Sequence, residues 1–147
     1  MKFWTTKHIH LIGWIASPCI IAFIIIFSLL PSSSISSPLL AFPYSDKVAH
    51  AIAYFAGAFT LSLAIVKVEG VQPYRVLLKK NIRRVVSIFV FVVLIGALVE
   101  LIQPMMNRSC ELLDLIADAI GAVGGIFCGL ATMHIVQKGE LGERDKR

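Results

Sequence analysis

Four long apolar runs constrain the fold of this chain more than any other feature of its sequence. They cover residues 9–30, 46–66, 85–103 and 111–136. A helix needs about 20 apolar residues to cross the hydrocarbon core of a bilayer, so each run is long enough to span a membrane. The mean hydropathy of +0.81 also exceeds that of an ordinary soluble domain. Because only helices and closed barrels cross bilayers and no strand pattern occurs, we predict an all-α, polytopic bundle of four transmembrane helices.

The basic residues are distributed unevenly among the segments that connect these runs. Of 14 Lys and Arg residues, twelve precede the first run, lie between the second and third, or follow the fourth. The other two are Lys47 and Arg108. This asymmetry follows the positive-inside rule and predicts that both termini and the 67–84 loop are cytoplasmic. The net charge of +5 thus reflects membrane topology, and we expect the lipid bilayer, not nucleic acid, as the partner.

The connecting segments are too short for a second domain, so residues 1–147 are predicted to form a single transmembrane domain. Residues 31–45 form a Pro/Ser-rich outer loop, which either covers a site as a lid or anchors the chain among the lipid headgroups. The basic 67–84 loop either contacts anionic headgroups or serves topology alone. The charged 137–147 tail is expected to be mobile.

Glycines repeat at a fixed spacing in the fourth run. Gly121, Gly125 and Gly129 recur every fourth residue and share one helix face. Small residues at this spacing let two helix backbones approach closely inside a bilayer. We therefore expect this face to pack tightly on a neighbouring helix.

Polar side chains gather at the ends of the runs that the charge asymmetry places outside. On the second run these are Asp46, Lys47, His50 and Tyr54, on the third Glu100 and Gln103, in the following connection Arg108, and on the fourth Asp114 and Asp118. Asp46, His50 and Tyr54 are spaced four residues apart and share a helix face. Because ionisable groups in membrane helices are costly and usually face other protein, we expect these side chains to form one pocket near the outer leaflet.

The charge balance of this expected pocket leaves three interpretations open. Four carboxylates facing two fixed cations cannot all stay ionised at low cost in a low dielectric. Some carboxyl groups are protonated, or His50 is charged, or a cation binds. The first two interpretations assign acid/base catalysis to His50, Glu100, Asp114 and Asp118, and ligand binding to Asp46, Lys47, Tyr54, Gln103 and Arg108. No spacing matches a metal-ligand motif, so we assign no metal ligand, although a divalent cation such as Mg²⁺, Mn²⁺ or Zn²⁺ would suit an oxygen-rich group with one His.

Each of these residues also has a purely structural interpretation. Asp46 suits a helix N-cap as well as it suits a site. Tyr54 fits a packed ring, and Gln103 fits the cap of a helix end. Glu111 fits a solvated residue in a first helical turn. For the remaining charged residues, the structural interpretation is a buried salt-bridge network that fixes how the helices pack.

Two stretches of the chain resemble the VanZ-like family of bacterial membrane proteins. They are SDKVAHAIAYFAG at 45–57 and the segment at 99–125 that begins VELIQ. The family pattern has an Asp-Lys-x-x-His helix start, a Glu-x-x-Gln helix end, an Arg in a short loop and an Asp that opens a Gly-containing helix. The matching residues are Asp46, Lys47, His50, Glu100, Gln103, Arg108 and Asp114. Two residues depart from the pattern: Asp118 stands where the family often has Asn, and Asn107 where it often has Gly.

The resemblance implies a multi-pass protein of the bacterial cytoplasmic membrane with a polar site in the outer leaflet. The founding member of the family is associated with teicoplanin resistance. We therefore expect a site that binds or modifies an amphiphile, namely a lipid headgroup, a cell-wall precursor or a lipoglycopeptide. An acid/base or metal-assisted hydrolase or transferase acting on a lipid headgroup is the first alternative. A structural or transport-related scaffold with a buried ion-pair network is the second.

Overall fold

The computed structural model describes residues 5–30, 44–70, 72–106 and 109–144. It contains the helices α1 (Thr6–Ser28), α2 (Ser45–Ile65), α3 (Tyr74–Ile102) and α4 (Leu112–Arg144), with a short 3-10 helix, η3 (Gln103–Met106), after α3. All four α-helices are long and apolar enough to cross a membrane, and the described residues contain no strand. The prediction of an all-α bundle of four membrane-spanning helices is confirmed, and the chain is a multi-pass membrane protein.

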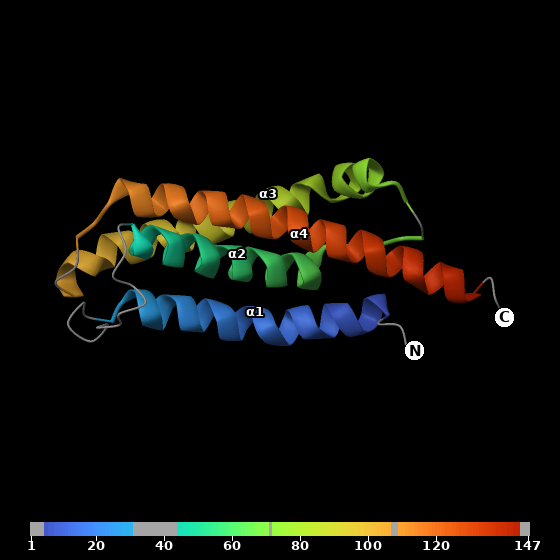
Figure 1. Cartoon of the computed structure of the whole chain (residues 1–147), viewed down its shortest axis with the longest axis horizontal. Coiled ribbons are helices and arrows are strands. Elements are labelled where there is room, and N and C mark those ends of the chain that lie inside the picture. The colour runs from blue at the N-terminus through green and yellow to red at the C-terminus, as the bar shows by residue number, and fades with distance from the viewer. Residues whose placement is uncertain (1–4, 31–43, 71, 107–108, 145–147) are drawn as a thin grey trace.

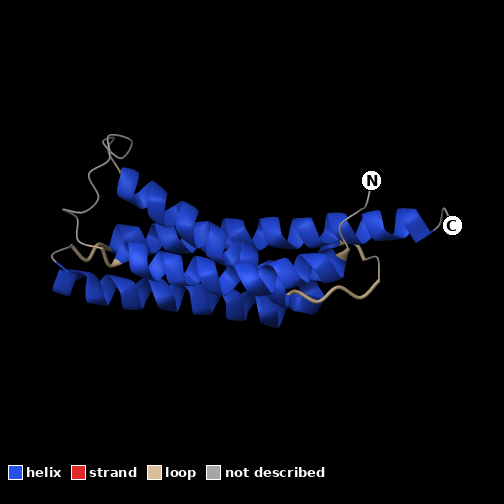
Figure 2. Ribbon diagram, turned by 90° about the horizontal axis from the view of Figure 1, so that it is seen from below, coloured by secondary structure: helices blue, strands red, loops and turns tan. Residues whose placement is uncertain are grey.

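The four helices lie side by side in one elongated bundle, with the start of α1 and the end of α4 at the same end (Figure 1). Figure 2 shows that the described loop residues lie only at the two ends of this bundle. The starts of α2 and α4 and the ends of α1 and α3 therefore share one end, which we call the polar end. The opposite end, with the connection between α2 and α3, is the basic end. Most of the 31–45 segment, residues 31–43, lies outside the described residues.

The third helix begins at Tyr74, so the predicted start at 85 and the predicted loop at 67–84 are wrong in part. Leu77 and Asn81 are buried and lie at helical spacing from the buried Ile88, which makes one continuous inner face. Asn81 also accepts from the backbone N–H of Lys67 at 3.0 Å and donates to its carbonyl at 2.8 Å. Helical periodicity therefore continues into the basic segment, and Asn81 ties that segment to the end of α2.

The fourth helix also runs further than predicted, to Arg144 instead of 136, so much of the tail expected to be mobile is helical. Gln137 is buried at 3% exposure. The Glu140 carboxylate accepts hydrogen bonds from the Thr6 backbone N–H and, at 2.7 Å, from its hydroxyl. These contacts connect the last turns of α4 to the first turn of α1 and explain why the helix continues past the apolar run.

The glycine face of α4 packs directly on α2, as predicted. An ideal Cβ at Gly121 would lie 2.1 Å from the Ala51 carbonyl oxygen, and one at Gly125 would lie 2.2 Å from that of Phe55. No side chain fits at such distances, so the contact depends on glycine. This close approach sets the spacing of the two helices that carry most of the polar side chains.

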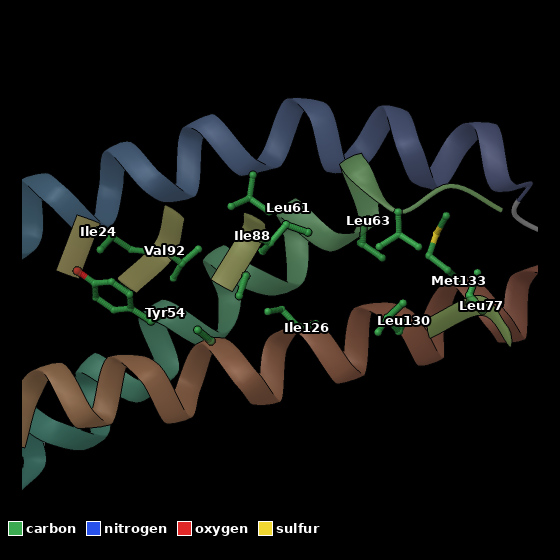
Figure 3. Packing of buried hydrophobic residues seen from close by; sticks show 13 residues of the cluster. Ile24, Tyr54, Leu61, Leu63, Leu77, Ile88, Val92, Ile126, Leu130 and Met133 are labelled. Atoms are coloured by element: carbon green, nitrogen blue, oxygen red, sulfur yellow. The ribbon is translucent and has the colours of Figure 1, made fainter. Parts of the chain in front are cut away.

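Between the ends, apolar side chains from all four helices fill the interior of the bundle (Figure 3). Ile24 comes from α1, Leu61 from α2, Val92 from α3 and Leu130 from α4. Many large apolar residues instead face outward, where lipid chains surround a membrane protein. At the basic end, a cavity of about 280 Å³ is lined by Lys67, Glu69, Gln72, Lys80, Asn81 and Arg84. Contact of this segment with anionic headgroups stays a prediction.

Candidate functional site at the polar end of the bundle

Lys47, in the first turn of α2, is the centre of an ion-pair cluster. Its ammonium donates to Asp46 at 3.0 Å, to Glu111 at 2.7 Å and to Asp114 at 2.9 Å. An ammonium group has three N–H donors, so the three carboxylates use all of them. The side chains of Asp46 and Glu111 are 44% and 41% exposed, whereas that of Asp114 is 6% exposed. The cluster therefore extends from the surface into the interior of the bundle.

His50 and Asp118 form a second, buried pair one turn deeper. The imidazole Nδ1 lies 2.9 Å from Asp118 Oδ1, and the two side chains are 7% and 0% exposed. The other ring nitrogen, Nε2, lies 4.0 Å from Asp114 Oδ2. Asp114 therefore uses one carboxylate oxygen toward Lys47 and turns the other toward His50. It connects the surface cluster with the buried pair.

Glu100 brings the end of α3 into the same group. Its Oε2 accepts the backbone N–H of Glu111 at 3.0 Å, just before the start of α4. The first N–H groups of a helix have no partner within the helix, so this contact is a cap supplied by another helix. The residue is only 4% exposed, and no described group hydrogen-bonds its second oxygen, Oε1. Such an oxygen is costly to bury without a partner.

Tyr54 and Gly96 lie against the buried pair of His50 and Asp118. The Tyr54 ring is nearly parallel to the His50 ring, with centroids 6.2 Å apart, and its buried hydroxyl has no hydrogen-bond partner within residues 5–30, 44–70, 72–106 and 109–144. An ideal Cβ at Gly96 would lie 2.5 Å from Asp118 Oδ2. Gly96 thus makes room on α3 for a carboxylate of α4. Sequence reasoning missed it, although a lone glycine four residues before Glu100 in an apolar helix was the available signal.

Glu111 is a further member of the cluster, which the sequence places on the same helix face as Asp114 but which was left out of the predicted site. It was interpreted as a solvated residue of a first turn, but it bonds Lys47 and accepts the Ser109 hydroxyl at 2.9 Å. The Lys47 ammonium holds the pKa of the Glu111 carboxyl below its ordinary value. Its spacing of three residues from Asp114, on the same helix face, was the signal for this role.

The other predicted site residues have different outcomes. Asp46 is not the N-cap of α2, because Tyr44 holds that position with a left-handed backbone (φ 65°) and Asp46 lies within the first turn. Gln103 donates from Nε2 to the Ser28 carbonyl at 3.2 Å, and this hydrogen bond joins it to α1 and not to the cluster. Arg108 lies outside the described residues.

The described part of the chain contains two groups whose geometry could hold a metal ion. The members of one, His50, Glu100 and Asp114, are all buried. The other consists of Asp46, Glu111 and Asp114, which already surround the Lys47 ammonium. In both groups one potential ligand atom from each residue lies within 4.8 Å of the others.

The fold and this cluster define a class: a multi-pass, all-α membrane protein with buried ionisable side chains from three helices at one end of its bundle. No protein-family model, no curated protein and no solved structure matches the chain. The resemblance to the VanZ-like family therefore depends on its sequence motifs.

Proposed function

We propose that this chain is a VanZ-like protein of the bacterial cytoplasmic membrane whose polar cluster binds or modifies the headgroup of an amphiphile in the outer leaflet. One observation carries the proposal. His50, Glu100 and Asp118, from three different helices, are buried together at the polar end of the bundle. Ionisable groups buried within membrane helices usually serve a site or a pathway, because their burial is costly.

The proposed orientation follows from the two ends of the bundle. The basic end carries Lys67, Lys80 and Arg84, and cytoplasmic loops of membrane proteins are enriched in Lys and Arg. With that end in the cytoplasm, both termini are cytoplasmic and the polar end faces outward. Asp118 is six residues into α4, which corresponds to about 9 Å along the helix. A ligand that reaches it therefore comes from the headgroup region.

The charges of the cluster limit the kinds of headgroup that it can bind. Lys47 is already paired with three carboxylates, so it holds an anionic headgroup only by exchanging one of them. Acidic groups outnumber basic groups among the described residues of the cluster. The cluster thus favours a headgroup with hydroxyl or ammonium donors. A lipid, a lipid-linked cell-wall precursor or a lipoglycopeptide such as teicoplanin could present such donors.

The pair of His50 and Asp118 favours a second candidate function, a hydrolase or transferase acting on such a headgroup. The Asp118 carboxylate accepts the Nδ1–H of His50, which leaves His50 Nε2 as a proton acceptor facing Asp114. In this mechanism Nε2 takes the proton of an attacking water or hydroxyl group and returns it to the leaving oxygen. The bond to the leaving group breaks as the bond to the attacking oxygen forms.

The test compares carboxylate-to-amide variants at the two ends of the bundle. Glu100→Gln and Asp114→Asn remove charge from the cluster, and Glu69→Gln makes the same change at the basic end. Detergent-purified proteins are titrated with teicoplanin, a lipid-linked cell-wall precursor and phospholipids, and producing cells are tested for teicoplanin susceptibility. We expect the wild type to bind one of these amphiphiles saturably. Glu69→Gln should retain this binding, and the two cluster variants should lose it while they stay folded.

The other outcomes distinguish the alternatives. Cluster variants that bind the amphiphile but no longer convert it support the enzyme. Wild-type protein that binds none of the probes, together with cluster variants that no longer fold, overturns the proposal in favour of a structural ion-pair network.

A further inference from the structure

We propose that His50, Glu100 and Asp114 bind a divalent transition-metal ion, Zn²⁺ or Mn²⁺, and that Asp118 orients the imidazole ligand. One potential ligand atom from each of the three residues lies within 4.8 Å of the others, and all three residues are buried. Ligand atoms lie about 2.0–2.2 Å from Zn²⁺, so two of them are at most about 4.4 Å apart. Small side-chain adjustments are enough to close the site. The inference goes beyond amphiphile binding, and it gives Nε2 of His50 to the metal ion in place of the proton-acceptor role in the second candidate function.

His50 is prepared for coordination through one ring nitrogen. Its Nδ1 lies 2.9 Å from Asp118 Oδ1, and the hydrogen bond to this carboxylate leaves the lone pair on Nε2. Nε2 in turn lies 4.0 Å from Asp114 Oδ2. A metal-binding His typically donates its other N–H to a carboxylate, which fixes the ring and raises its basicity. Asp118 is fully buried and fits this orienting role.

Glu100 supplies the observation that points to a ligand independently of the clustering. It is 4% exposed, and its Oε1 has no hydrogen-bond partner among the residues that the structure describes. The other oxygen, Oε2, is fixed by the Glu111 backbone N–H at 3.0 Å. A buried carboxylate oxygen without a partner is destabilising, and a metal ion would satisfy it. Asp114 has the same division of roles, since its Oδ1 is held by Lys47 at 2.9 Å and its Oδ2 faces His50.

The charge of the buried group also fits a divalent ion. Three buried carboxylates, those of Glu100, Asp114 and Asp118, are close to one fixed cation of the described residues, Lys47. Lys47 is also bonded to Asp46 and Glu111, so with a neutral His50 the buried carboxylates retain at least two negative charges, which a divalent ion offsets. The single imidazole among oxygen ligands favours Zn²⁺ or Mn²⁺ over Mg²⁺ or Ca²⁺. Of the three interpretations that the sequence leaves open, namely protonated carboxyl groups, a charged His50 and a bound cation, the inference takes the third.

The outer group of Asp46, Glu111 and Asp114 is the weaker candidate for the same ion. The Lys47 ammonium lies 2.7–3.0 Å from an oxygen of each residue, so it already supplies the positive charge there. Two of the three side chains are also more than 40% exposed. This group therefore provides the matched control for the buried one.

The test measures metal content directly, with no amphiphile present. Full-length protein in detergent is stripped with chelator, titrated with Zn²⁺ or Mn²⁺, desalted and analysed by elemental mass spectrometry. We expect about one ion per chain. His50→Ala and Glu100→Gln lose the ion, Glu111→Gln keeps it, and Asp118→Asn weakens affinity by about 10–100-fold.

Two outcomes overturn the inference. One is wild-type protein that shows no saturable binding of either ion. The other is binding that Glu111→Gln abolishes and His50→Ala retains, which places the ion in the outer group. Should the variants fail to fold, pulsed electron paramagnetic resonance of wild-type protein loaded with Mn²⁺ decides: coupling to an imidazole nitrogen supports the site, and its absence refutes it. Failure here leaves amphiphile binding untouched, since the two assays use different probes.

Discussion

Gly96 on α3 lies directly against the carboxylate of Asp118 on α4: an ideal Cβ at residue 96 would lie 2.5 Å from Asp118 Oδ2 and 3.2 Å from the Tyr54 ring. Gly96→Ala therefore pushes the carboxylate away from His50 or separates the two helices. We expect a loss of about 1–3 kcal/mol in unfolding free energy, typical of an overpacked interior. Thermal unfolding in detergent measures it. Gly142→Ala is the control, because no atom of the described residues lies within 4 Å of a Cβ there. Equal melting temperatures for the two variants would refute the close contact between Gly96 and Asp118.

Gly125 tests the contact between α2 and α4 that sets the geometry of the cluster. Its ideal Cβ would lie 2.2 Å from the Phe55 carbonyl oxygen, and backbone atoms cannot move aside without moving the helix. At Gly124 the nearest atom is 3.2 Å away, on the Phe55 ring, which can rotate. We expect Gly125→Ala to lower the melting temperature clearly and Gly124→Ala to change it little. A larger effect at Gly124 would contradict the packing described.

The contacts of Lys47 should differ in energy according to the burial of each partner. Lys47→Met leaves the carboxylate of Asp114, 6% exposed, without its cation, and removing one partner of a buried pair costs about 3–5 kcal/mol. Asp46→Asn removes a partner that is 44% exposed, and such a surface pair contributes about 0–1 kcal/mol. Chemical unfolding of both variants in detergent checks the ranking. Similar losses would mean that burial does not determine the strength of these contacts.

Much of this arrangement could be predicted from the sequence. Apolar run length identified the four spans, and the spacing of His50 and Asp118 on their helices placed both at the same end of the bundle. The sequence suggested an amphipathic interfacial piece around 74–82 but not that α3 itself extends back to Tyr74, because hydropathy falls where the basic residues begin. The individual contacts between helices could not be predicted from the sequence either. Nothing in the spacing of Gln103 shows that it bonds the Ser28 carbonyl of α1.

Acid should weaken the contact between Glu111 and Lys47. The neighbouring ammonium lowers the pKa of the Glu111 carboxyl below its ordinary value of 4.5. A carboxyl group with a lowered folded-state pKa contributes stability above its unfolded pKa, and this contribution disappears as the pH falls through the folded value. We therefore expect the wild type to melt above Glu111→Gln at neutral pH. That difference should shrink below about pH 4.5. A difference that stays constant to low pH would show that the carboxylate charge is not involved.

Cys110 can report the orientation of the bundle in cells. It is exposed and lies between η3 and α4 at the polar end, whereas Cys19 and Cys128 lie within α1 and α4. Cys19→Ser and Cys128→Ser together leave Cys110 as the single thiol of the chain. If the basic end is cytoplasmic, a membrane-impermeant maleimide should label Cys110 in intact cells. The matched control adds Cys110→Ser and Glu69→Cys, which moves the thiol to the basic end and should be labelled only after permeabilisation. The reverse pattern would place the polar cluster on the cytoplasmic side and exclude a site in the outer leaflet.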